Sequence, residues 1–145
     1  MRKPVQTILA IADETLLGAL VAKLSADPDF EVLRHTDDLQ RAIRDARTYV
    51  PGFLVLDGDL MRGQVTIRGV VRACPETRVV VLGGSEDPDQ LLSAIEAGAS
   101  GYILKAAAID EIVQALRSVL AGEGYVPPSL AFKLLRRKYA GPEPS

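Results

Sequence analysis

The chain has 145 residues and a formal net charge of −2, with 48% hydrophobic and 25% charged side chains. These values are typical of one ordinary globular domain, and the charge balance argues against a surface that binds nucleic acid or membranes over its whole extent. Cys74 is the single cysteine and His35 the single histidine, which excludes an intrachain disulfide and a zinc site of the usual Cys/His kind.

Five short apolar segments, the first of them rich in β-branched residues, are predicted to be strands. They cover residues 5–11, 30–34, 53–56, 79–82 and 101–104. The third and fourth segments are almost continuously apolar, which is typical of strands buried on both faces of a parallel sheet. The second alternates apolar and polar residues, which predicts a half-exposed strand.

Each strand is followed by apolar residues at spacings of three and four, which indicates a helix with one buried face. These helices begin near Thr15, at Asp37 or Asp38, near Val65, at Asp87-Pro88 and at Ile109. Strand and helix thus alternate five times with short connections. This alternation predicts an α/β domain with a mostly parallel sheet and right-handed crossovers.

The last part of the chain, from residue 122 on, begins and ends with glycine and proline. Leu130, Leu134 and Leu135 are predicted to lie on one side of a short helix, and residues 141–145 are predicted to be a linker or a frayed end. The basic cluster from Lys133 to Lys138 is interpreted as a solvated helix face in preference to a DNA contact. No apolar run reaches the length of a membrane span and no signal peptide is evident, so the chain is expected to be cytoplasmic.

In open parallel α/β sheets, ligands bind beyond the carboxyl ends of the strands. The polar residues that follow the five predicted strands are therefore expected to meet in one crevice. They are Asp13 and Glu14, His35, Asp57 and Asp59, then Gly83, Gly84 and Ser85, and finally Lys105. Carboxylates from two strand ends suit a hard cation such as Mg²⁺, and a carboxylate beside it can attack a phosphoryl group. No Gly-Lys-Ser/Thr or Gly-x-Gly-x-x-Gly loop is present to bind a nucleotide.

These residues carry a resemblance to a known family. Asp13 after the first strand, Leu-Val-Leu-Asp ending at Asp57, and Ala-Gly-Ala-Ser-Gly-Tyr-Ile-Leu-Lys ending at Lys105 resemble a response-regulator receiver domain. With Leu-Ala-Gly-Glu-Gly-Tyr from Leu120 on, the chain resembles receivers that precede a LuxR/NarL-type helix-turn-helix domain. The resemblance covers residues 5–128. It implies a five-stranded parallel sheet of flavodoxin-like topology, in the strand order 2-1-3-4-5, with helices on both faces.

The resemblance also implies a role in two-component signal transduction, as a signalling domain and not as an enzyme. Asp57 would accept a phosphoryl group from a sensor histidine kinase, and Lys105 would pair with a phosphoryl oxygen. Asp13, Asp57 and the backbone carbonyl of Asp59 would hold Mg²⁺. Tyr102 would be the aromatic residue that changes rotamer on activation, together with the switch position Gly83.

Further expectations concern partners and domains. A homodimer is expected, with no membrane contact, and DNA is expected to be bound only through a C-terminal domain that is not in this chain. Residues 1–124 are predicted to be the receiver domain. Residues 125–145 are predicted to be a C-terminal extension or linker that leads to the DNA-binding domain.

Two positions depart from the family pattern. Ala12 stands where the family has the first of two acids, which predicts weakened Mg²⁺ binding. Gly83 stands where the family has Ser or Thr, so the hydroxyl that reads the phosphoryl group is missing. The alternative hypothesis is therefore a degenerate receiver that works as a phosphorylation-independent interaction or dimerisation module. A flavodoxin-like binding enzyme is a third hypothesis, disfavoured because the loop after the first strand lacks a hydroxyl-rich phosphate cradle.

Each candidate residue also has a purely structural interpretation. Asp57 precedes a glycine and is compatible with a simple turn, and Lys105 with a solvated strand end. Asp13 is predicted to cap the first helix whether or not it also binds a metal. Tyr102 is equally compatible with packing under a helix.

Overall fold

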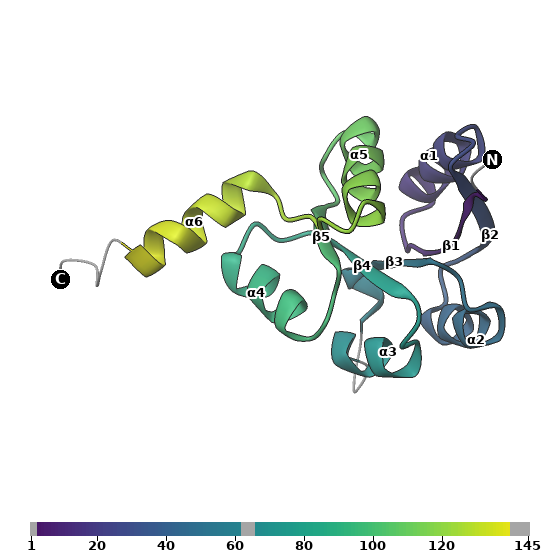
Figure 1. Cartoon of the computed structure of the whole chain (residues 1–145), viewed down its shortest axis with the longest axis horizontal. Helices are drawn as coiled ribbons and strands as arrows, with labels where there is room; N and C mark the ends of the chain where they lie inside the picture. The colour runs from purple at the N-terminus through teal and green to yellow at the C-terminus, as the bar shows by residue number, and fades with distance from the viewer. Residues whose placement is uncertain (1–2, 62–65, 140–145) are drawn as a thin grey trace.

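The computed structural model describes residues 3–61 and 66–139, which contain a five-stranded sheet between two layers of helices (Figure 1). The strands are β1 (Val5–Ala10), β2 (Phe30–Thr36), β3 (Phe53–Asp57), β4 (Arg78–Gly83) and β5 (Gly101–Leu104). They pair in the order β2-β1-β3-β4-β5, and every pairing is parallel. The predicted fold class and strand order are confirmed.

Helices on both faces enclose the sheet. They are α1 (Glu14–Ser25), α2 (Leu39–Tyr49), the short 3₁₀ helix η1 (Gly58–Leu60), α3 (Ile67–Ala73), α4 (Pro88–Glu96), α5 (Ile109–Leu120) and α6 (Pro128–Tyr139). In Figure 1, α1 and α5 lie on one face, and α2, α3 and α4 lie on the other. Val65, the predicted start of the third helix, and residues 141–145 lie outside the described residues. None of the helices in the described parts of the chain has both the length and the apolarity that crossing a membrane requires.

The alternating directions of strand side chains divide the core into two halves. Leu9 and Val55 pack in the cluster that contains the buried residues of α1 and α5. Ile8 and Leu54 pack in the cluster that contains the buried residues of α2 and α3. Because successive strand residues point to opposite faces, a strand covered on both faces must be apolar throughout. This explains the apolar run of residues 53–56 in β3, which are all buried; the last residue of the strand, Asp57, is buried as well.

Short polar residues and one strained residue define the helix ends. Asp13 caps α1 and Asp38 caps α2, each through its side chain. Gly98 follows α4 with φ of 107°, a left-handed conformation that glycine takes without strain. Helix α2 ends directly before Pro51, where Val50 takes a left-handed conformation with φ of 46°. A β-branched residue is strained in this conformation.

The segment after α5 packs on the domain. The carbonyl of Tyr125 accepts the Tyr102 N–H at 2.9 Å, beside a bridge to Gly101, so this segment lies on the outer edge of β5. Helix α6 then packs against α4, and Leu130 is fully buried in their shared cluster. Leu135 is 56% exposed, so the expectation that it shares the buried side of Leu130 is wrong. At 3.6 residues per turn, positions 130 and 135 lie about 140° apart around the helix. The domain boundary at residue 124 stays a prediction.

Candidate functional site

The carboxyl ends of the central strands lie at the same edge of the sheet. Ala10 in β1 is paired with Leu56 in β3, and Asp57 is paired with Leu82 in β4. Lys105 directly follows β5, which is the next strand along the sheet. The residues after these strands therefore come together at one edge, as open parallel sheets require of their ligand sites.

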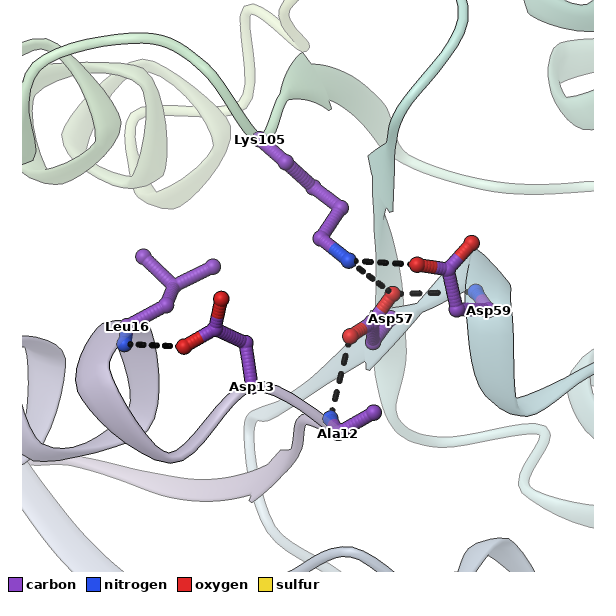
Figure 2. A network of polar contacts seen from close by, with 6 residues as sticks. All are labelled: Ala12, Asp13, Leu16, Asp57, Asp59 and Lys105. Atoms are coloured by element: carbon purple, nitrogen blue, oxygen red, sulfur yellow. Dashed lines mark hydrogen bonds and ion pairs between the residues drawn. The ribbon is translucent and has the colours of Figure 1, made fainter.

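Asp57 is the centre of this edge, and its side chain is fully buried. Its Oδ2 accepts the Ala12 N–H at 3.0 Å, and its Oδ1 accepts the Asp59 N–H at 2.9 Å. Lys105 Nζ lies 3.1 Å from the same Oδ1 (Figure 2). A buried carboxylate is costly unless its oxygens are hydrogen-bonded and its charge is paired, and here both conditions are met. Asp57 therefore caps η1, as a turn residue does, and its charge is also paired with Lys105.

Lys105 joins the two acids of β3 and η1. Its Nζ lies 2.7 Å from Asp59 Oδ2 as well as 3.1 Å from Asp57 Oδ1, and its side chain is 18% exposed. Burial opposes the charged form, but the hydrogen bonds to Asp59 and Asp57 outweigh it and raise the pKa of Lys105. The ammonium group is therefore charged at neutral pH and sits at the edge where an anion would arrive.

Asp13 lies beside this network on the α1 side. Its Oδ1 accepts the Leu16 N–H at 3.0 Å, as the predicted helix cap does, and the residue is exposed. In Figure 2 its carboxylate is turned toward the first turn of α1, whereas Asp57, Asp59 and Lys105 meet directly. The backbone of the preceding residue, Ala12, is the part of this loop that contacts Asp57.

The oxygen donors at this edge suit a hard cation. The predicted donors are the carboxylates of Asp13 and Asp57 and the backbone carbonyl of Asp59. In the structure Asp57 is at the centre of the polar network, whereas the Asp13 carboxylate caps α1. No cluster of three or more His, Cys, Asp or Glu side chains that could hold a metal occurs within residues 3–61 and 66–139. Mg²⁺ commonly takes only one or two carboxylates and keeps several waters, so the donor set fits this ion. The methyl group of Ala12 adds no oxygen.

The two predicted switch residues are in direct contact. Tyr102 is 2% exposed, and its hydroxyl donates to the Ser85 carbonyl at 3.0 Å. A Cβ built on Gly83 would lie 2.0 Å from Tyr102 Oη and 2.2 Å from Cζ. The tyrosine therefore occupies the space that any larger residue at position 83 would need. Burial raises the pKa of Tyr102, against the opposing effect of the hydrogen bond to Ser85.

Sequence reasoning missed the main-chain groups of this site. The N–H groups of Ala12 and Asp59 and the carbonyl of Ser85 are present whatever the side chain, so residue type gives no signal for them. The contact between Gly83 and Tyr102 follows from the register in which β4 and β5 pair. Tyr102 is paired with Val81, and a residue two positions farther along a strand points to the same face.

Comparisons with known proteins agree with this architecture. Residues 8–117 match the family model described as the response regulator receiver domain. The response regulator GacA of Pseudomonas viridiflava is 28% identical over 135 residues, which are 91% of this chain and 63% of that protein. The chain therefore spans less than two thirds of this relative's length.

Solved structures show the same fold. A two-component response regulator of the LuxR family from Aurantimonas sp. SI85-9A1 has a TM-score of 0.83 and 25% identity, with coverage of 93% of this chain and 98% of that one. The RcsB response regulator of Salmonella typhimurium, studied for DNA interaction, also has a TM-score of 0.83, with 20% identity and coverage of 97% and 72%. At that identity, the likeness to RcsB shows the fold alone.

Proposed function

The chain belongs to the response regulator receiver family, and from this we propose that Asp57 accepts a phosphoryl group from a sensor histidine kinase. The observation that carries the proposal is the buried Asp57 carboxylate, held by two backbone N–H groups and the Lys105 ammonium. Such a carboxylate is fixed in orientation and lies at the edge of the sheet where family members of this fold class bind ligands.

In the proposed reaction, a carboxylate oxygen of Asp57 attacks the phosphorus of a phosphohistidine. The new P–O bond gives an acyl phosphate, the P–N bond breaks, and its electron pair stays on the imidazole nitrogen, which is reprotonated. The N–H donors from Ala12 and Asp59 hold the carboxylate plane before the attack. This positioning removes part of the entropic barrier of a bimolecular reaction.

Lys105 supplies positive charge to the transferred group. Its ammonium lies between the carboxylates of Asp57 and Asp59, and the raised pKa keeps it protonated. Phosphoryl transfer proceeds mainly through positioning and electrostatic stabilisation of the equatorial oxygens. We assign Asp13, Asp57 and the Asp59 carbonyl to a Mg²⁺ ion, which when bound neutralises charge on the same oxygens.

Intact mass after incubation with Mg²⁺ and acetyl phosphate tests the proposal. We expect the mass gain of one phosphoryl group, and we expect none in Asp57→Asn. The matched control is Asp37→Asn, an exposed acid in the loop after β2, which should be phosphorylated like the parent. An unmodified parent at saturating donor and metal would refute phosphoryl transfer to Asp57.

The metal assignment has its own measurement. Ala12→Asp should raise the affinity for Mg²⁺, measured by calorimetry without any phosphodonor, by about tenfold. The added carboxylate supplies the acid that the family has at this position. Equal affinities in the two proteins would show that Ala12 does not weaken the site.

The packing of Tyr102 on Gly83 favours a second candidate function. A receiver whose tyrosine is already buried, with no hydroxyl at position 83, is suited to act as an interaction module without phosphorylation. The two candidates differ in one readout. In the second, Asp57→Asn leaves partner binding or self-association unchanged.

The cellular output of this receiver, control of transcription, is inferred from the similar proteins. We assign control of transcription to a DNA-binding domain beyond residues 125–145, with this segment as the extension that leads to it, and homodimerisation as the state that acts. The LuxR-family structure and the partial coverage of GacA support this assignment. A full-length version that binds no DNA in any phosphorylation state would contradict it.

A further inference from the structure

Tyr102 contacts three parts of the molecule through three different groups. Its hydroxyl donates to the carbonyl of Ser85, in the loop after β4, at 3.0 Å. Its backbone N–H donates to the carbonyl of Tyr125, in the segment between α5 and α6, at 2.9 Å. Its ring packs in the buried cluster that contains Leu130 of α6. One residue of β5 thus connects the carboxyl edge of the sheet with the last helix.

The space beside Gly83 holds the hydroxyl end of the Tyr102 ring. Gly83 is the last residue of β4 and directly follows Leu82, which is paired with Asp57. A Cβ at position 83 would lie 2.0 Å from Tyr102 Oη, so the ring and a larger residue cannot share this space. Because closely packed interiors resist gradual deformation, the ring is either packed on Gly83 or displaced from it. These are the two states of an element beside the candidate site.

Helix α6 is held on the domain by few contacts. Of its twelve residues, all within the described part of the chain, only Leu130 is buried, and Leu134 packs partly buried against the same cluster. In the ion pair between Arg137 and Asp89 both side chains are more than half exposed, and such pairs contribute little to stability. In Figure 1, α6 begins close to β5 and projects outward past α4. An element with so little buried surface opens more easily than the rest of a domain.

The position of the Tyr102 ring and the docking of α6 therefore depend on each other. Tyr102 has the largest side chain in the cluster in which Leu130 is buried. Displacing the ring leaves a void in this cluster, so Leu130 loses packing that keeps α6 on the domain. Undocking of α6 in turn removes Leu130 from the cluster and weakens the packing of the ring. A coupling free energy of this kind acts equally in both directions.

We propose that Tyr102 couples the carboxyl edge of the sheet to α6, so that displacement of its ring from Gly83 releases α6 from α4. This conformational device is built from residues of this chain alone. It goes beyond the proposed function, because it does not depend on whether Asp57 accepts a phosphoryl group. An event that moves the ring at the end of β4 thereby changes the docking of the helix at the other end of the cluster.

Native-state hydrogen exchange measured by NMR tests this coupling. Gly83→Ala should speed the exchange of the α6 amides by at least about tenfold, because the new Cβ displaces the ring. Gly84→Ala is the matched control and should leave this exchange unchanged, since a Cβ there meets no atom within 4 Å. Tyr102→Phe should speed the exchange by about fivefold, because the hydroxyl no longer holds the ring to Ser85.

Two further variants separate this coupling from a general loss of stability. Leu39→Ala removes a buried side chain from the cluster of α2 and α3, which contains no residue of α6, and should leave the α6 amides at the parent's exchange rate. Leu130→Ala should speed the exchange of the Tyr102 amide by at least about fivefold, which is the reverse direction of the same coupling. Circular dichroism checks that each variant is folded, and if Gly83→Ala is not, Tyr102→Phe decides.

Exchange of the α6 amides at the parent's rate in Tyr102→Phe, and also in Gly83→Ala where that variant folds, would overturn the proposal. Acceleration in a folded Gly83→Ala alone would support it and assign the coupling to the packing of the ring. Equal acceleration in Gly84→Ala or Leu39→Ala would overturn it, because α6 would then follow the stability of the whole domain. None of these samples contains a phosphodonor, so a failed coupling leaves the reaction at Asp57 standing, and an unmodified Asp57 leaves the coupling standing.

Discussion

Replacing Gly83 with alanine should force Tyr102 out of its buried position. The added Cβ would lie 2.0 Å from Tyr102 Oη, 2.2 Å from Cζ and 2.7 Å from Cε2, distances that no side-chain contact tolerates. The atoms in conflict belong to a rigid ring, so a small adjustment of a flexible chain end cannot relieve the clash. The ring must leave, or the strand backbone must shift.

The expected cost follows from what Tyr102 loses. A buried aromatic side chain contributes roughly 2–3 kcal/mol through apolar area removed from water. The hydrogen bond to the Ser85 carbonyl adds about 1 kcal/mol. If the ring stays and the backbone shifts instead, overpacking costs roughly 1–3 kcal/mol. We therefore expect Gly83→Ala to lower the free energy of unfolding by about 2–4 kcal/mol.

Urea unfolding followed by circular dichroism measures this cost, and the neighbouring glycine provides the control. A Cβ on Gly84 meets no atom within 4 Å, so Gly84→Ala should be nearly neutral. In a Tyr102→Ala background, Gly83→Ala should also be nearly neutral, which gives a coupling energy of about 2 kcal/mol or more. A Gly83→Ala variant as stable as Gly84→Ala, or a coupling energy near zero, would refute the reasoning.

Other expectations follow from single residues. Val50→Gly should raise the free energy of unfolding by about 1 kcal/mol, because glycine takes the left-handed conformation without strain, and a loss of stability in urea unfolding would contradict this. Leu130→Ala should cost about 3 kcal/mol if α6 is an integral part of the domain, whereas Ser129→Ala at an exposed position should be neutral; equal melting temperatures would make α6 a loosely attached linker. Because the pKa of Tyr102 is raised in the folded state, its contribution to stability is present below about pH 10 and is lost as pH rises through the folded pKa. Ultraviolet titration of phenolate should show a late ionisation step, and Tyr102→Phe should remove it.

The fold was predictable because its pattern is repeated along the whole chain. Strands buried on both faces, such as residues 53–56, must be apolar throughout, and each helix shows one apolar face. The family resemblance supplied the strand order, which periodicity alone does not contain. The left-handed conformation of Val50 at the end of α2 was not predictable, because valine has no preference for that conformation.

The side chains of the candidate site could be predicted from the sequence, whereas most of the hydrogen bonds that connect them could not. Asp57 and Lys105 follow predicted strands, and the rule for open parallel sheets places them together. The donors that hold Asp57 are backbone groups of Ala12 and Asp59, which every residue type carries. In the sequence, Gly83 was noticed because the family has Ser or Thr, and thus a hydroxyl group, at this position. In the structure the Tyr102 ring fills the space beside this glycine. The strand register brings the two residues together, but how closely they pack depends on volume and is known only from the structure.

The pairing of Tyr125 with the outer edge of β5 sets a limit on how far this domain can be trimmed. Without Tyr125 the Tyr102 amide would face solvent on a bare sheet edge, and such edges recruit strands from other molecules. A fragment without α6 would also lose Leu130, which leaves a cavity in the buried cluster that contains Leu91. A fragment that ends at Gly124 should therefore aggregate, while one that ends after Tyr139 should stay dispersed, and a fusion partner is best attached beyond that residue.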